Sequence, residues 1–143
     1  MMYLLDTNVV SELRKVRLGR ADHHVARWAD SVETASLYLS VLTIQELEIG
    51  VARAERRHAP QGAIFRTWLE QRVLPTFANR ILNIDTAVAL RAARLHVPDP
   101  KPLADSLIAA TALVHGMTVV TRNVADFSAT GVLLLNPWEG RAA

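Results

Sequence analysis

Tyr3-Leu4-Leu5-Asp6-Thr7-Asn8 joins a short apolar segment of strand length to an acidic residue and then to a helical pattern over residues 8–14. The same succession of apolar segment, polar turn and helical pattern recurs along the chain. Four further segments have the length and apolar composition of strands: 37–41, 80–83, 118–120 and 132–135. Further helical patterns lie between these segments, over residues 22–30, 43–57, 63–76, 86–96 and 102–115.

Strands that alternate with helices predict a parallel sheet, because consecutive parallel strands need a crossover connection that a helix can supply. The predicted fold class is α/β, with three layers (α/β/α) and a central parallel sheet of about five strands. In the helix over 86–96, Val88 and Ala92 share one face while Arg91 points elsewhere, as an amphipathic helix packed on a sheet requires. The length of the chain predicts one domain over residues 1–143.

The composition excludes several classes of protein. The chain has no cysteine, which excludes a disulfide framework and a thiolate metal site. The longest apolar helical run, 107–114, is far shorter than the roughly 20 residues of a bilayer span, and the N-terminus lacks the features of a secretory signal. We therefore expect a cytoplasmic protein without a membrane segment. The net charge of +2 and the pI near 9.5 permit an anionic partner without requiring one.

Four acidic residues adjoin the ends of predicted strands. Asp6 directly follows the first strand, Glu46 lies in the first turns of the helix after the second, and Asp126 follows the fourth. Asp105 lies in the first turn of the helix over 102–115. Because the carboxyl ends of parallel strands meet at one edge of a sheet, where ligands of open α/β folds bind, we predict that these four carboxylates come together there.

Each of these acids also has a purely structural explanation. Thr43 and Glu46 have the spacing of a capping box for a helix that begins near Thr43, and Asn123 and Asp126 repeat that spacing. Asp105 would complement the positive end of a helix dipole. Taken one at a time, these acids do not establish a site.

Two further acids near the same segments are predicted to lie outside the site. Glu48 is two residues from Glu46, and side chains two apart on a helix face different sides. Glu12 is predicted to face solvent from the first helix, although a position at the edge of the crevice stays open.

As a group, the four acids point to a metal ion. Carboxylates within a few ångströms repel one another unless a cation neutralises them, and ligation by oxygen alone favours Mg²⁺ or Mn²⁺. Such an ion can activate water and neutralise charge on a leaving oxygen, which is the chemistry of phosphodiester hydrolysis. The predicted catalytic residues and metal ligands are Asp6, Glu46, Asp105 and Asp126. The predicted supporting residues, each also a common turn or cap residue, are Asn8, Ser40, Thr43, Thr121 and Asn123.

Four segments resemble, in order, the motifs of PIN-domain toxins. They begin at Asp6-Thr7-Asn8, at Thr43-Ile44-Gln45-Glu46, at Leu103-Ala104-Asp105-Ser106 and at Thr121-Arg122-Asn123, the last of which continues to Asp126-Phe127. The ending Asn136-Pro137-Trp138 resembles that of the VapC/FitB group. The resemblance covers nearly the whole chain. It implies a PIN fold and Mg²⁺- or Mn²⁺-dependent RNA cleavage, with the four acids above matching the family's acids.

The resemblance also implies partners. PIN-domain toxins of this type act in type II toxin–antitoxin modules, so it implies a cognate antitoxin, commonly with a DNA-binding part, together with an RNA substrate and a homodimer. A partner helix would need an apolar groove. Five apolar side chains are candidates either to line such a groove or to lie in the core: Val25, Trp28, Ile64, Trp68 and Leu69.

Two alternative functions are weighed against this prediction. A phospho-acceptor signalling domain also gathers acids at the rim of a parallel sheet, but it requires a lysine after the last strand, where this chain has Asn136-Pro137-Trp138. A PIN fold that only binds RNA or protein is the second alternative, and the presence of all four acids argues against it.

Overall fold

The computed structural model describes residues 1–140 and contains one parallel sheet of five strands in the order β3-β2-β1-β4-β5. The first and fourth strands coincide with the predicted segments, while the others are shorter than predicted. The strands are β1 Tyr3–Leu5, β2 Leu37–Ser40, β3 Ile81–Leu82, β4 Thr118–Val120 and β5 Leu134–Leu135.

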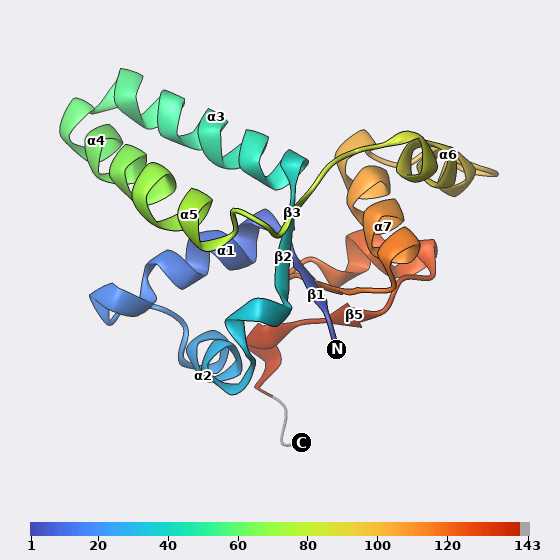
Figure 1. The fold of residues 1–143 in the computed structure, drawn as a ribbon, viewed down its shortest axis with the longest axis horizontal. Helices are drawn as coiled ribbons and strands as arrows, with labels where there is room; N and C mark the ends of the chain where they lie inside the picture. Colours follow the sequence, from blue (N-terminus) through green and yellow to red (C-terminus); the bar gives the residue numbers. More distant parts are fainter. Residues whose placement is uncertain (141–143) are drawn as a thin grey trace.

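The helices occupy the intervals that the sequence patterns predicted, and they lie on both sides of the sheet (Figure 1). The α-helices are α1 Thr7–Arg14, α2 His23–Ser31, α3 Val41–Arg57, α4 Ala59–Trp68, α5 Leu74–Thr76, α6 Thr86–Leu95 and α7 Leu103–His115. Shorter helical turns are η1 Val16–Leu18, η2 Thr34–Ser36, η3 Leu69–Val73, η4 Val124–Thr130 and η5 Pro137–Glu139. None of the helices in the described part of the chain combines the length and apolar composition that a bilayer crossing requires.

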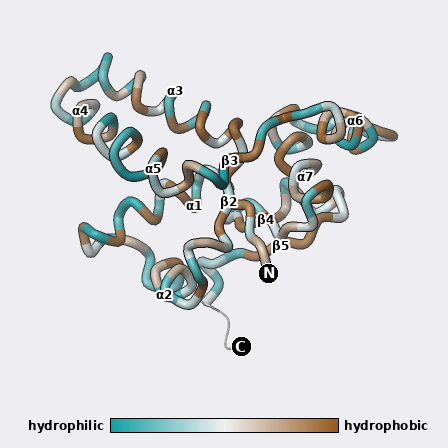
Figure 2. The backbone as a smooth tube through the Cα atoms, in the orientation of Figure 1, coloured by the Kyte–Doolittle hydropathy of each residue, from teal (hydrophilic) through white to brown (hydrophobic). Residues whose placement is uncertain are grey.

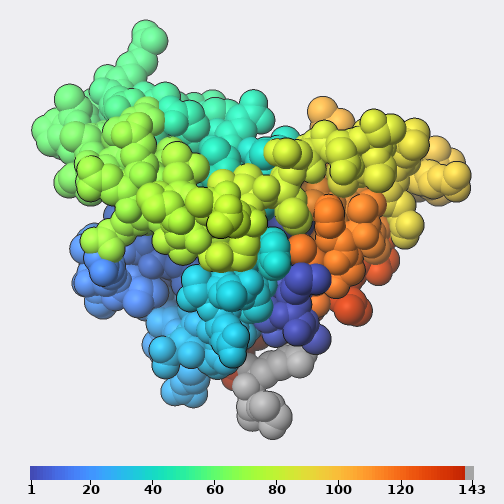
Figure 3. All heavy atoms as spheres, viewed as in Figure 1, coloured from blue at the N-terminus to red at the C-terminus, as the bar shows by residue number. Residues whose placement is uncertain are grey.

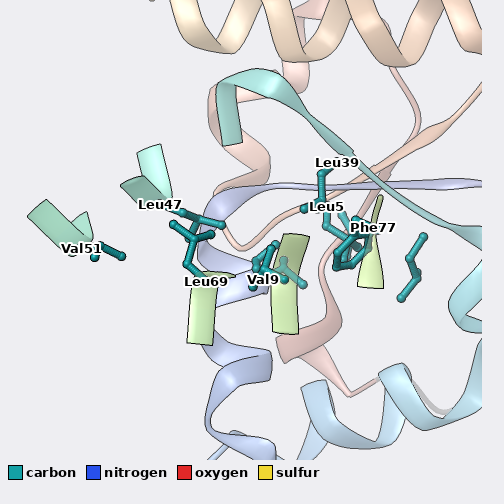
Figure 4. Packing of buried hydrophobic residues seen from close by; sticks show 11 residues of the cluster. Leu5, Val9, Leu39, Leu47, Val51, Leu69 and Phe77 are labelled. Carbon is teal, nitrogen blue, oxygen red and sulfur yellow. The ribbon is translucent and has the colours of Figure 1, made fainter. Parts of the chain in front are cut away.

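Successive residues of β1 point to opposite faces of the sheet, and each face carries its own core. Leu5 packs with residues of α1, α3, η3 and α5, while Leu4 packs with residues of α7 and η4. Figure 4 shows Leu5 and Leu39 of the sheet near Phe77, with Val9 and Leu69 beside them. The predicted three-layer α/β/α arrangement is therefore confirmed.

The strand order reverses at β1. The chain first builds outwards from β1 to β2 and β3, and then returns to the other side of β1 with β4 and β5. The carboxyl ends of β1 and β4 are consequently neighbours, and the loops that leave them begin at Asp6 and Thr121. A crevice for ligands is expected at such a reversal point.

The start of α3 differs from the prediction. The helix begins at Val41, and the Ser40 hydroxyl accepts a hydrogen bond from the Leu42 amide at 3.0 Å. Ser40 is therefore the N-cap, and the capping-box interpretation of Thr43 and Glu46 is wrong. The reason is that β2 ends one residue early, so Val41, predicted as a strand residue, already belongs to the helix.

The predicted helix over 63–76 is longer and is divided. It begins at Ala59, where His58 caps it, passes through the π-helical turn η3, and ends at Thr76. Together α3 and α4 form an antiparallel hairpin that extends from the sheet, and α6 lies at another corner of the molecule (Figure 1). Apolar and polar residues alternate along α3 within each turn, as expected for a helix that is covered on one side (Figure 2).

Two features hold this hairpin together. The Arg66 guanidinium of α4 forms a bidentate pair with Glu48 at 2.7 and 2.8 Å and also bonds Glu55 at 3.0 Å. These groups are exposed, so their contribution to stability is small. The closer contact is at Gly62, where a Cβ atom would overlap the backbone of Glu55. Only a glycine permits the two helices to approach this closely.

Replacing Gly62 with alanine should lower the free energy of unfolding by about 1–3 kcal/mol, because the added methyl group forces α4 away from α3. Urea denaturation of both proteins measures the difference. Gly50→Ala is the matched control: Gly50 lies in the same hairpin with open space around it, and alanine there should stabilise the helix slightly. Equal stability of Gly62→Ala and wild type would contradict the close packing.

Candidate active site

Asp6 lies at the point where β1 becomes α1. Its amide donates to the Val120 carbonyl at 2.9 Å, which extends the pairing of β1 with β4 by one residue. Its carboxylate Oδ1 accepts a hydrogen bond from the Thr7 amide at 2.9 Å and so caps α1. The side chain is nearly buried, with 9% of the residue surface exposed. Its position is therefore set by both the sheet and the helix.

The second carboxylate oxygen of Asp6 is held by neutral donors. The Thr121 hydroxyl donates to Oδ2 at 2.8 Å, and the Asn8 amide group donates to the same oxygen at 3.3 Å. Thr121 Oγ1 in turn accepts from the Asn123 amide at 3.0 Å, and Asn8 Oδ1 accepts from the Arg122 amide at 3.2 Å. This network joins the loop after β1 to the loop after β4.

Glu46 lies on the exposed side of α3 and is held from α1. The Thr7 hydroxyl donates to Glu46 Oε1 at 2.6 Å, across 39 residues of sequence. Thr7 was absent from the predicted supporting residues, although it stands in the Asp6-Thr7-Asn8 motif. Thr7 therefore contacts two of the acids, Glu46 through its hydroxyl and Asp6 through its backbone amide.

Asp105 is the third residue of α7, and it lies close enough to the other acids for their charges to affect its pKa. Its pKa is raised, first by burial and then by repulsion from the carboxylates of Asp126, Asp6 and Glu46. Pro102, the N-cap of α7, makes no side-chain hydrogen bond to the helix. The four predicted acids are therefore gathered at one rim of the sheet.

Asp126 approaches this group from η4. Its amide bonds the Asn123 carbonyl at 3.0 Å, but Asn123 makes no side-chain cap to the turn. The capping interpretation of this pair is therefore unsupported, and the Asp126 side chain is exposed. The contribution of Asn123 to the site comes from its backbone, which bonds Thr121.

The donor chemistry of this group suits a hard divalent cation, since all four side chains offer carboxylate oxygens. The pKa of Asp105 is raised first by burial and then by the charges of its three neighbours, and a cation would offset both effects. Among residues 1–140, however, no three such side chains stand close enough together to hold an ion as they are. The acids are gathered at the rim without forming a closed set of ligands.

The predicted supporting residues have different environments. Asn8 and Thr121 bond Asp6. Ser40 caps α3 and, in the described part of the chain, makes no hydrogen bond to any of the four acids. Thr43 is fully buried on α3, one turn before Glu46, and its hydroxyl has no hydrogen-bond partner in the described part of the chain. A buried hydroxyl without a partner is costly.

The two acids predicted to lie outside the group do so. Glu48 is paired with Arg66 on the far side of α3, as described above. Glu12 is not solvent-facing, contrary to the prediction: its carboxylate accepts a hydrogen bond from the Asp22 amide at 2.7 Å. This bond and the nearby Lys15 lower the pKa of Glu12. Glu12 thus fastens the start of α2 to α1.

A hydrogen-bonded relay behind Asp105 was missed in the sequence. The Lys101 amide donates to His96 Nδ1 at 3.2 Å, which leaves the proton of the neutral ring on Nε2, 3.0 Å from the Ser106 hydroxyl. Ser106 donates in turn to the Leu103 carbonyl at 2.7 Å. The relay joins α6 to the first turn of α7, which contains Asp105. No local pattern marks it, because His96 and Ser106 meet only through the packing of α6 on α7.

Two hollows of the surface are lined by none of the four acids. One, of about 790 Å³, is a mainly apolar groove between the α1–η1 segment and the α4–α5 segment. These blue and green segments meet on the face shown in Figure 3. The other, of about 500 Å³, lies between α2 and the C-terminal turn η5. Of the five candidate groove residues, Ile64 and Trp68 line the first hollow, Trp28 lines the second, and Val25 and Leu69 are buried in the core.

Comparison with known proteins decides the family. The model of the PIN domain matches residues 3–133. The chain belongs to the PIN-domain family. It is 39% identical to the VapC ribonuclease Y4jK of Sinorhizobium fredii (strain NBRC 101917 / NGR234), over 96% of this chain and 99% of that protein.

Two solved structures extend the comparison. FitAcB from Neisseria gonorrhoeae superposes with a TM-score of 0.86 at 38% identity, and the match covers 96% of this chain and 99% of the other. A toxin–antitoxin complex from Klebsiella pneumoniae superposes with a TM-score of 0.64 at 28% identity, covering 94% and 97%.

Membership of the PIN-domain family agrees with the strand order. The phospho-acceptor signalling domains weighed above have the order 2-1-3-4-5, whereas this PIN domain has β3-β2-β1-β4-β5. The signalling alternative is therefore wrong. The fold and the family expected from the sequence are both confirmed, while the roles of the individual site residues stay predictions.

The crowding of carboxylates predicts that the metal-free protein is strained at neutral pH. The raised pKa of Asp105 means that the folded state binds this proton more tightly than the unfolded state, so stability falls as the pH rises from about 3.9 through the raised pKa. With EDTA at pH 7, Asp105→Asn should therefore unfold at a higher urea concentration than wild type. The difference should shrink near pH 3, where both side chains are neutral.

Asp99→Asn serves as the control, since Asp99 is exposed in the loop before α7 and should leave the urea midpoint unchanged. A lower midpoint for Asp105→Asn at pH 7 would mean that the Asp105 carboxylate is stabilised, contrary to its raised pKa.

The relay predicts that His96 holds the first turn of α7. In His96→Ala the Lys101 amide and the Ser106 hydroxyl each lose a partner, a loss of about 1–1.5 kcal/mol that should speed local amide exchange roughly tenfold. Hydrogen exchange of residues 103–107 measures this. His115→Ala, at the exposed far end of the same helix, should leave their exchange unchanged. Equal exchange in wild type and His96→Ala would eliminate the positioning role.

Proposed function

We propose that the chain is a metal-dependent ribonuclease and the toxic component of a type II toxin–antitoxin module, folded as a single PIN domain. The observation that carries this proposal is that Asp105 lies within electrostatic range of Asp6, Glu46 and Asp126 at the carboxyl edge of the sheet. Identity of 39% with a protein named a VapC ribonuclease supports the reaction, and the fold shared with a toxin–antitoxin complex supports the biological role.

The proposed cofactor is a divalent cation, Mg²⁺ or Mn²⁺. Asp6 and Asp105 are the central ligands in this proposal, and Glu46 and Asp126 complete the set of catalytic acids. When bound, the cation activates water for attack on phosphorus and neutralises the charge on the leaving oxygen. Among residues 1–140 no three of these side chains stand close enough to hold an ion as they are, so this proposal includes a closer approach of the acids when a cation neutralises them.

The protein's own groups position the acids. Thr121, which follows β4, and Asn8 of α1 both donate to one oxygen of Asp6, which orients the carboxylate. Thr7 does the same for Glu46 from the start of α1. Such outer hydrogen bonds fix the orientation of ligands and tune their basicity. Asn123 supports Thr121 through its amide, and Ser40 sets the start of α3 and hence the height of Glu46 above the sheet.

The proposed partners are RNA as substrate, an antitoxin and a second copy of the chain. The apolar groove between α1–η1 and α4–α5 suits an amphipathic segment of an antitoxin, because Ile64 and Trp68 offer apolar surface. Arg14, Arg17 and Arg72 stand at the same groove and favour acidic residues on that segment. The antitoxin's DNA-binding part would lie outside this groove. The homodimer is proposed from the resemblance to PIN-domain toxins, and the cytoplasmic location from the composition of the chain.

Cleavage of single-stranded and structured RNA by the purified protein, with Mg²⁺, Mn²⁺ or EDTA, tests the proposed reaction. Asp6→Asn and Asp105→Asn should each reduce the rate at least a hundredfold, because each removes a charged ligand. Asp30→Asn, an exposed acid of α2, should cleave like wild type. Equal activity in all four proteins would identify a contaminating nuclease. An inert wild type that still binds RNA would favour the non-catalytic alternative.

A further inference from the structure

The hollow between α2 and the C-terminal turn is a built cavity of about 500 Å³ that no part of the proposed reaction uses. We propose that it binds one nucleotide of the RNA, beyond the nucleotides at the scissile phosphate. This inference rests on the proposed ribonuclease function and deepens it, because it names a subsite for the substrate. Its chemistry requires a nucleotide with base, ribose and phosphate rather than a free anion.

The cavity is joined to the acidic rim by a short, well-held loop. Arg122 directly follows Thr121, and its amide donates to Asn8 Oδ1 in the acid network. Its carbonyl accepts a hydrogen bond from Asn136, which lines the cavity, and its guanidinium lies over the Trp138 ring at 5.1 Å. The Arg122 backbone thus connects the acid network to the cavity wall, and its side chain lies against the C-terminal turn that forms this wall. A strand of RNA that leaves the acidic rim on this side meets Arg122 first.

The charges change sign along this path. The rim carries four carboxylates, whereas the next groups are the guanidinium of Arg122 and then that of Arg27, which lines the cavity. Among residues 1–140, neither arginine forms an ion pair with a carboxylate. Phosphates away from the scissile bond have no metal to neutralise them and need cationic side chains. Arg122 and Arg27 are placed to supply them.

The remaining lining groups suit a base and a ribose. Trp28 offers an aromatic surface, and its ring is fixed by an edge-to-face contact with Tyr3 at 5.3 Å. His24, Asn136 and Glu139 offer donors and acceptors, and the carboxylate of Glu139 would repel a bare anion but can accept hydrogen bonds from a hydroxyl or an amino group. The volume lies in the range of cavities that bind small organic molecules.

The walls of the cavity are closely packed against one another. Gly140 has a positive φ of 60°, and a Cβ atom there would overlap the imidazole ring of His24. The C-terminal turn therefore lies directly against α2. The Asn136 side chain also accepts a hydrogen bond from the Trp138 amide at 2.9 Å, which fixes the turn that carries the cavity wall. The cavity is preformed, so little ordering is needed when a nucleotide enters.

The three tryptophans make a direct test possible. In EDTA, nucleoside 5′-monophosphates are titrated into the protein while the indole N–H signals are followed by NMR. Trp28 should shift with saturation in the millimolar range, whereas Trp68, which lines the other groove, should not. Inorganic phosphate should leave Trp28 unshifted at the same concentration. Shifts at Trp68 alone, an equal response to phosphate, or no shift at all would each overturn the proposal.

Variants connect this cavity to the substrate. Arg27→Gln should weaken nucleotide binding about tenfold and raise the KM for RNA cleavage, while kcat stays near that of wild type. Arg94→Gln, an exposed arginine of α6 that lines neither hollow, should change neither quantity. An unchanged affinity in Arg27→Gln would overturn the assignment of the phosphate contact.

The outcomes separate the two proposals. If the nucleotide shifts Trp28 but the wild type cleaves no RNA, the ribonuclease function fails and the cavity no longer serves as its subsite. If the wild type cleaves RNA in a metal-dependent manner but no nucleotide shifts Trp28, the cavity proposal is wrong and the ribonuclease function stands.

Discussion

The parallel pairing of β1 with β2 on one side and β4 on the other is the constraint on which the rest of this PIN domain depends. The strand has only three residues, yet the Asp6 backbone and side chain extend its connection to β4 beyond the last strand residue. Because the strand order reverses there, loops that are more than 100 residues apart in sequence leave the sheet side by side. The crevice at this reversal results directly from the topology.

Placing several acids at this crevice costs electrostatic free energy, and hydrogen bonds within the fold offset only part of it. Neutral donors from Thr121, Asn8 and Thr7 hold the carboxylates of Asp6 and Glu46. Asp105 receives no comparable help, and its pKa is raised by burial and by the three neighbouring charges. Repulsion among these carboxylates destabilises the folded chain, and a cation placed among them would reduce that repulsion. The same repulsion would therefore favour the binding of a cation.

The rest of the surface is organised around this acidic rim. Two acids outside the site have partners elsewhere: Glu48 pairs with Arg66, and Glu12 accepts a hydrogen bond from the start of α2 and pairs with Lys15. On the side of the C-terminal turn, the surface becomes cationic at Arg122 and leads to a preformed cavity. On the side of α4, the apolar groove is the surface proposed for the antitoxin. The proposed reaction, nucleotide subsite and antitoxin contact therefore fall on separate surfaces of one small fold.

The alternation of apolar segments and helical patterns was sufficient to predict the parallel sheet, its three layers and the four acids, because periodicity and strand-end position are properties of local sequence. The sequence also identified Thr121 and Asn8 as partners of the site. From the sequence, however, the start of α3 was predicted too late and Glu12 was predicted to face solvent. Both predictions were wrong because the choice of cap and the docking of α2 depend on contacts between distant segments. Thr7 against Glu46, His96 against Ser106, and the cavity between α2 and the C-terminal turn were decided only by the tertiary structure, because each is made by side chains that packing alone brings together.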